Sequence, residues 1–148
     1  MKGKFSMKSG LDHAKILAGK ADGDLKVCEI SLQYDGPLDV VAFHLQQAAE
    51  KLLKALLAAR TIVYPKTHDL DELMNLLPAD FSTVLSFRER ISGWTAYAVD
   101  IRYEIVAYEK EELREALLTA QSLRETALGL ILPAREPRIL PTNRDPKQ

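Results

Sequence analysis

The sequence contains a single cysteine, Cys28, among 148 residues. An intrachain disulfide is therefore excluded, and a reducing compartment is the simpler expectation. No run approaches the roughly 20 apolar residues that a membrane span requires, and the polar start of the chain does not resemble a signal peptide. We expect a cytoplasmic protein with no membrane contact.

An excess of charge of one sign is also missing. Lysine and arginine number 20 and aspartate and glutamate 21, which gives a net charge of −1. Such a chain has no global positive field to hold nucleic acid, so RNA binding would need a local basic patch. The composition, with 47% hydrophobic and 28% charged residues, is typical of one ordinary globular domain.

The spacings of the common metal and phosphate sites are absent. None of the histidines, His13, His44 and His68, has a second His or Cys at metal-binding spacing. The glycines match neither the dinucleotide-binding pattern nor the P-loop. Cys28 lies on an apolar stripe, which indicates a core position rather than a nucleophile. We predict no metal and no resident cofactor.

What the sequence does have is helical periodicity, clearest at residues 40–59. Apolar residues recur there every three or four positions, with no Gly or Pro between them. The same reasoning predicts helices over about 11–32, 37–60, 67–77, 80–101 and 110–132. Short connections between them favour an all-α, up-and-down bundle of four or five helices.

Local signals define the ends of these helices. Ser9 and Thr67 are candidate N-caps. In the turn at 34–37, Gly36 can adopt positive φ and Pro37 suits the start of the next helix. We predict a flexible segment at 1–9, the bundle at 10–132, and a proline-rich, disordered tail at 133–148.

Large aromatic residues are few, and Phe87, Trp94 and Tyr97 are concentrated in one predicted helix. A bundle of this size could leave part of their surface exposed, and a partner usually covers such surface. We therefore expect a dimer. Core positions for all three are the alternative.

The predicted helix at 37–60 carries polar residues opposite its apolar stripe, namely Gln46, Gln47, Glu50, Lys51 and Lys54. A row of amide and ammonium donors suits a phosphate or a base. Composition alone favours a plainer interpretation, in which the surface is solvated and Glu50 and Lys54 form an i,i+4 ion pair.

Three strings change this balance: FHLQQAAEKLLKALL at 43–57, YPKTHDLDEL at 64–73 and YAVDIRYE at 97–104. Together they resemble the HEPN family of small all-helical proteins, over roughly residues 10–132. The resemblance implies a bundle that forms a homodimer. It also implies a partnership with a small nucleotidyltransferase, as in toxin–antitoxin pairs, and in one branch nucleotide binding.

Ribonuclease members of that family carry an arginine followed, after four to six residues, by a histidine, and they cut RNA without metal. Arg102 stands where the arginine is expected, but Ala107, Tyr108 and Glu109 occupy the histidine positions. Without an imidazole, the usual acid–base partner is missing. The resemblance therefore implies nucleotide binding without catalysis. If the protein is an enzyme, the catalytic candidates are Arg102 with Tyr108 or His68.

The predicted nucleotide site combines cations for phosphate, an amide for a base or ribose, and tyrosines for stacking. Its residues are Gln47, Lys51, Lys54, Tyr97, Arg102 and Tyr103. The ligand would be a nucleotide such as ATP, and RNA is the weaker expectation. Two alternatives remain open: a metal-independent endoribonuclease toxin with a degenerate motif, and a non-catalytic dimeric adaptor.

Overall fold

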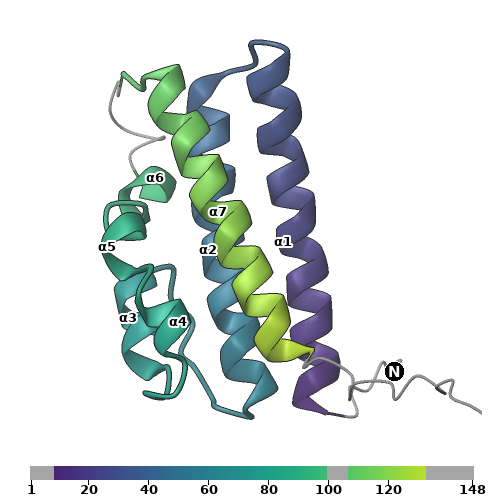
Figure 1. Cartoon of the computed structure of the whole chain (residues 1–148). Coiled ribbons are helices and arrows are strands. Elements are labelled where there is room, and N and C mark those ends of the chain that lie inside the picture. The colour runs from purple at the N-terminus through teal and green to yellow at the C-terminus, as the bar shows by residue number, and fades with distance from the viewer. Residues whose placement is uncertain (1–8, 100–106, 133–148) are drawn as a thin grey trace, which may run out of the picture.

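The computed structural model describes residues 9–99 and 107–132, and no strand occurs among them. Three long helices form the bundle: α1 (Gly10–Gln33), α2 (Leu38–Ala59) and α7 (Lys110–Ile131). α1 runs antiparallel to α2 and α7, and α2 packs against both of the others (Figure 1). This all-α bundle confirms the predicted fold class. None of its described helices has the length and hydrophobicity needed to cross a membrane.

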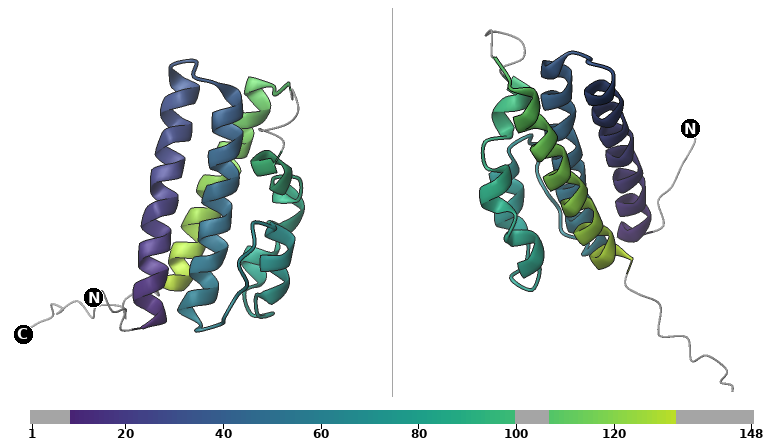
Figure 2. Two further views of the ribbon diagram at one scale, coloured as in Figure 1. Left: turned by 180° about the vertical axis from the view of Figure 1, so that it is seen from behind. Right: turned by 45° about the horizontal axis from the view of Figure 1, so that its top comes forward.

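A row of short helices covers the remaining side of α2 (Figure 2). The row consists of α3 (Leu70–Leu76), α4 (Ser82–Leu85), α5 (Arg88–Ile91) and α6 (Thr95–Val99). The prediction of one continuous helix over 80–101 is therefore wrong. The row still runs along α2 as a fourth, broken leg of the bundle.

Serine side chains account for these breaks. Ser86 Oγ donates to the Thr83 carbonyl at 2.7 Å, and Ser92 Oγ donates to the Glu89 carbonyl at 3.1 Å. Such bonds compete with the helical backbone ladder, and Gly93 lowers helix propensity further. Burial nevertheless follows the predicted spacing. The buried residues of this stretch are Phe81, Val84, Phe87, Ile91 and Trp94.

The core lies where α1, α2 and α7 meet. Leucines of α2 fill it, and Leu45, Leu52 and Leu56 are fully buried. Phe87 and Trp94 are each 5% exposed, so both are core residues, and Tyr97 is partly buried. The expectation of an exposed aromatic surface is therefore wrong for Phe87 and Trp94, and the predicted dimer must rest on other grounds.

Capping follows the predictions only in part. Ser9 caps α1 as predicted, because its hydroxyl accepts the Asp12 N–H at 3.2 Å. Asp69, not Thr67, caps α3: the Asp69 carboxylate accepts the N–H of Asp71 at 2.9 Å. Thr67 instead accepts the N–H of Asp69 at 3.0 Å. The segment just before α3 is therefore held by two successive side-chain bonds.

The turn after α1 also differs from the prediction. Asp35, with φ 58°, adopts the left-handed conformation that we expected for Gly36. The Gly36 N–H donates to the Ser31 carbonyl at 2.6 Å, as in a Schellman motif. Glycine is suited to position 36 for another reason: a Cβ there would lie 3.0 Å from the Ser31 side chain.

α2 ends in the same type of turn. Thr61 has φ 59°, and the Ile62 N–H donates to the Leu57 carbonyl at 2.9 Å. Glycine commonly fills this position of the motif, and a β-branched residue is an outlier there. The turn sends residues 62–69 back along α2, toward its polar side.

Candidate functional site

Two buried carboxylates organise the polar side of α2. Asp24 of α1 and Glu50 of α2 are each 6% exposed. A buried charge is costly unless it is paired and hydrogen-bonded. Each of these carboxylates receives one imidazole and one ammonium group, so the polar side of α2 is neither plainly solvated nor sealed by apolar neighbours.

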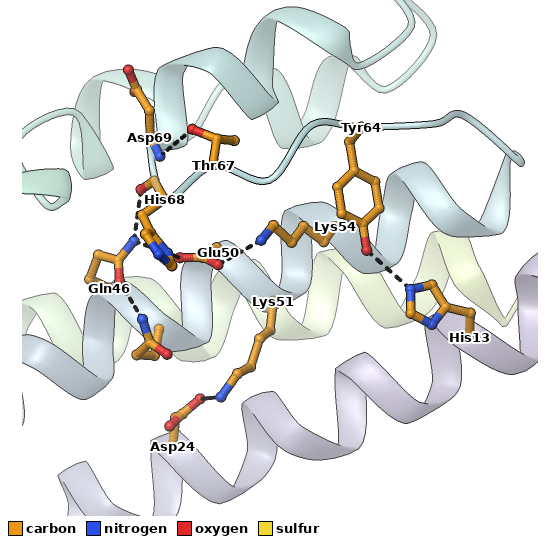
Figure 3. Close-up of polar contacts among 11 residues, drawn as sticks. His13, Asp24, Gln46, Glu50, Lys51, Lys54, Tyr64, Thr67, His68 and Asp69 are labelled. Atoms are coloured by element: carbon orange, nitrogen blue, oxygen red, sulfur yellow. Dashed lines mark hydrogen bonds and ion pairs between the residues drawn. The ribbon is translucent and has the colours of Figure 1, made fainter. Parts of the chain in front are cut away.

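The first group, the Asp24 cluster, consists of Asp24, His44 and Lys51. Asp24 Oδ1 lies 2.8 Å from Nδ1 of His44, and Oδ2 accepts a hydrogen bond from Nζ of Lys51 at 2.7 Å. The contact with Lys51 joins α1 to α2 (Figure 3). The side chains of His44 and Lys51 are 27% and 25% exposed, so solvent reaches both.

The second group, the Glu50 cluster, consists of Glu50, Gln46, Lys54 and His68 (Figure 3). Glu50 Oε1 lies 2.9 Å from Nδ1 of His68, and Oε2 accepts a hydrogen bond from Nζ of Lys54 at 2.7 Å. Gln46 is fully buried, and its amide donates to Glu50 Oε1 at 3.1 Å and to the His68 carbonyl at 2.9 Å. The cluster thus ties the 62–69 segment to α2.

The charge state of Glu50 determines the tautomer of His68. Burial raises the pKa of the Glu50 carboxyl, but the hydrogen bonds from its cluster outweigh this effect and hold the pKa below its ordinary value. An ionised carboxylate can only accept hydrogen bonds, so Nδ1 of His68 is the donor. Nε2 of a neutral His68 is then an acceptor. The His68 side chain is 75% exposed, which leaves this ring accessible.

Tyr64 extends the polar contacts beyond the Glu50 cluster. The ammonium of Lys54 lies 5.6 Å from the centre of the Tyr64 ring. The Tyr64 hydroxyl lies 3.0 Å from Nε2 of His13, at the start of α1 (Figure 3). Burial, and then the charge of Glu50, raise the pKa of Tyr64, so its hydroxyl stays protonated and neutral.

The structure groups some of the predicted site residues. Gln47, Lys51 and Lys54 share the polar side of α2, and the Gln47 amide donates to Gln46 Oε1 at 2.9 Å. His68, a catalytic candidate, joins them through Glu50.

Tyr97 lies in an aromatic group of its own. Its ring stacks on Trp94 with a centroid distance of 6.1 Å and meets Tyr108 edge-on at 5.6 Å. Burial raises the pKa of Tyr97, with smaller contributions from Glu112 and Tyr108. The two other predicted residues, Arg102 and Tyr103, lie outside the described residues, so their place in the site stays a prediction.

The model of the HEPN domain matches residues 14–130 of the 148-residue chain. The chain belongs to the HEPN domain family. No curated protein and no solved structure matches it. Membership confirms the predicted family, and the HEPN domain contains both clusters in full.

Within this HEPN domain, no sequence pattern was used to predict a role for Asp24, and the solvated interpretation of the polar side of α2 is wrong for Glu50 and Gln46, which are buried. A signal was available. Asp24 lies three residues after Ala21 and four before Cys28, on the buried stripe of α1. Glu50 lies three residues before Leu53 on a buried stripe of α2. An acidic residue on an apolar stripe needs a buried partner.

Cys28 is a core residue, as predicted. It is fully buried, and its thiol donates to the Val41 carbonyl at 3.5 Å. Burial raises its pKa to about 12, with further contributions from the charges of Asp24 and Glu29. The reactive thiolate is therefore not formed near neutral pH.

Other parts of the HEPN domain have fewer features of a binding site. A cavity of about 420 Å³ lies between α1 and α7 and contains residues of neither cluster. Its arginine, Arg124, is already paired with Asp22 at 2.5 Å. Within residues 9–99 and 107–132, no three His, Cys, Asp or Glu side chains are placed to hold a metal ion.

Proposed function

We propose that this HEPN protein binds a nucleotide on the polar side of α2 and acts as the non-catalytic partner of a small nucleotidyltransferase. One observation carries the proposal. Lys51 and Lys54 lie three residues apart on one helix, and a carboxylate holds each ammonium at 2.7 Å. Two fixed cations at this spacing suit a ligand that carries phosphate groups.

Both ammonium groups have capacity for a ligand. A lysine has three N–H donors, and the carboxylate uses one. The side chains are 25% exposed for Lys51 and 15% exposed for Lys54, so a phosphate oxygen can approach from solvent. Because the carboxylates already order these long side chains, binding loses less conformational entropy. Gln47, one turn before Lys51 on the same side of α2, would contact a base or ribose.

Titration of the protein with ATP in a calorimeter tests the site. We expect the Lys51→Ala/Lys54→Ala variant to bind at least about tenfold more weakly, because it loses two charge-assisted contacts. Lys15→Ala/Lys20→Ala is the matched control, since it removes the same charge from exposed positions of α1. Equal affinity of the two double variants would contradict the site. Absence of ATP binding by the unaltered protein would contradict the function.

The partnership has its own test. The chain is co-expressed with a nucleotidyltransferase encoded beside it, and a tag on one protein is used to isolate the complex. Co-purification in a fixed ratio supports the proposal, and a gene neighbourhood without such an enzyme contradicts it. We also propose a homodimer, which light scattering would show as twice the chain mass of 16.6 kDa.

RNA cleavage is the second candidate function, and the His68–Glu50 pair favours it. An imidazole that donates Nδ1–H to a carboxylate has Nε2 ready to accept a proton from a ribose 2′-hydroxyl. Incubation with RNA in a chelator tests this idea. Cleavage that disappears in His68→Gln and persists in His13→Gln would establish it, and intact RNA with the unaltered protein would exclude it.

A further inference from the structure

The Asp24 and Glu50 clusters repeat one arrangement. In each, a buried carboxylate receives a histidine Nδ1 on one oxygen and a lysine Nζ on the other, at 2.7–2.9 Å. The charges of the two carboxylates and the two ammonium groups cancel. With both imidazoles neutral, the surface therefore has no surplus positive charge to offer an anion.

We infer that anion binding on this surface is coupled to proton uptake, with His44 and His68 each gaining a proton when a phosphate-bearing ligand binds. Protonation of both rings changes the formal charge of the two clusters from zero to plus two. Each ring then carries a full charge beside its lysine. The inference rests on the proposed function, because it concerns the same site.

The surroundings of each imidazole support this coupling. His44 faces Asp24 of α1 and Lys51 of α2, with the Phe43 ring edge-on at 5.3 Å. His68 faces Glu50 and Lys54 of α2, and the neighbouring Asp69 is occupied in capping α3.

Each ring thus adjoins one negative and one positive charge. A proton on the ring is attracted by the carboxylate and repelled by the ammonium, so an arriving anion tips the balance toward the charged form. Histidine is the residue whose charge changes most readily near neutral pH.

Linkage makes the effect reciprocal. If the ligand favours the protonated imidazoles, protonation favours the ligand by the same factor. Nucleotide affinity should therefore rise as the pH falls. A surface built on lysines alone would lack this part of the dependence.

The third histidine of the chain provides an internal control. His13 bonds to the Tyr64 hydroxyl at 3.0 Å and belongs to neither cluster. His13→Gln therefore removes an imidazole without removing a neighbour of Asp24 or Glu50. It can be compared directly with His44→Gln and His68→Gln.

The experiment is calorimetric titration with ATP at pH 7 in several buffers that differ in ionisation enthalpy. The dependence of the heat on the buffer gives the number of protons taken up. Because the ligand is the same in every titration, its own protons cancel between variants. We expect equal uptake for the unaltered protein and His13→Gln, and up to one proton less for each of His44→Gln and His68→Gln.

Two outcomes separate this inference from the proposed function. If His44→Gln/His68→Gln binds ATP and takes up as many protons as the unaltered protein, the coupling is wrong and the nucleotide site stands. If the unaltered protein does not bind ATP, the proposed function fails first. Should a variant misfold, the ring resonances of the three histidines in the unaltered protein give the same answer by NMR. Unchanged protonation of His44 and His68 on ATP addition would overturn the coupling.

Discussion

The Asp24 cluster and the Glu50 cluster use the same chemical groups on different supports. Asp24, His44 and Lys51 all belong to two packed helices, whereas His68 belongs to the non-helical 62–69 segment. The His44 side chain is 27% exposed and that of His68 is 75% exposed. The same type of buried carboxylate therefore joins two helices in the Asp24 cluster and holds an accessible imidazole in the Glu50 cluster.

The position of His68 on a non-helical segment also explains why the Glu50 cluster includes Gln46. A helix fixes its own backbone, but a non-helical segment leaves carbonyl groups to be satisfied by other means. The Gln46 amide bonds both the carboxylate and the His68 backbone. The loop-mounted histidine is thus positioned through its main chain as well as through its ring.

Removal of the carboxylates should have the largest effect and tests the comparison most directly. We expect Glu50→Ala to lower the free energy of unfolding by about 3 kcal/mol, because it leaves the buried Gln46 amide and the Lys54 ammonium without their acceptor. Asp24→Ala should cost somewhat less, since its cluster has no third donor. Urea unfolding followed by circular dichroism measures both.

Asp22→Ala is the control for this comparison. Asp22 lies at an exposed position of α1, two residues before Asp24, and pairs with Arg124 of α7. Its loss should cost less than about 1 kcal/mol. A larger cost for Asp22→Ala than for Asp24→Ala would mean that burial does not set the strength of these clusters.

A lower pH should have the next largest effect on stability, through the Glu50 cluster. The folded-state pKa of Glu50 lies below its unfolded value, so its ionisation stabilises the fold above about pH 4.3–4.5. That stabilisation is lost as the pH falls below this range, through the folded-state pKa. Glu50→Gln should remove this part of the pH dependence, measured as unfolding free energy from pH 6 to pH 3. Glu125→Gln, at an exposed position, should leave it in place.

The histidines should show the smallest effect on stability. His68→Gln removes a largely exposed ring, and we expect a change within about 0.5 kcal/mol at pH 8. His44→Gln removes a more buried partner and should cost about 1 kcal/mol. Thermal unfolding of both variants gives the comparison. A greater loss in His68→Gln would show that the loop histidine is the more structural of the two.

The long helices could be read from periodicity because nothing interrupts it. The ends of α1, α2 and α7 fall within about two residues of prediction. The stretch from 82 to 99 has the same apolar spacing, so its burial was predictable. Its breaks depend on hydroxyl groups that can bond either to solvent or to the backbone, and spacing does not distinguish these outcomes.

For the candidate site too, the sequence predicts one part and not the other. Helical phase alone places Gln47, Lys51 and Lys54 on one side of α2. The i,i+4 spacing also predicts the Glu50–Lys54 ion pair, which the structure contains. The other contacts could not be predicted from phase, because Asp24 meets Lys51 across 27 positions of sequence and His68 meets Glu50 across 18. Those meetings depend on how α1 docks and on where the 62–69 segment returns.

The 62–69 segment begins at the turn formed by Thr61. The left-handed backbone costs a residue with a Cβ about 1–2 kcal/mol, and β-branched residues rarely adopt it. The turn that leads toward His68 therefore starts from a conformation that threonine disfavours. Thr61→Gly would relax it without altering any group that a nucleotide could contact. The orientation of the His68 imidazole would then change through a turn seven residues earlier in the sequence, with the chemistry of the surface unchanged.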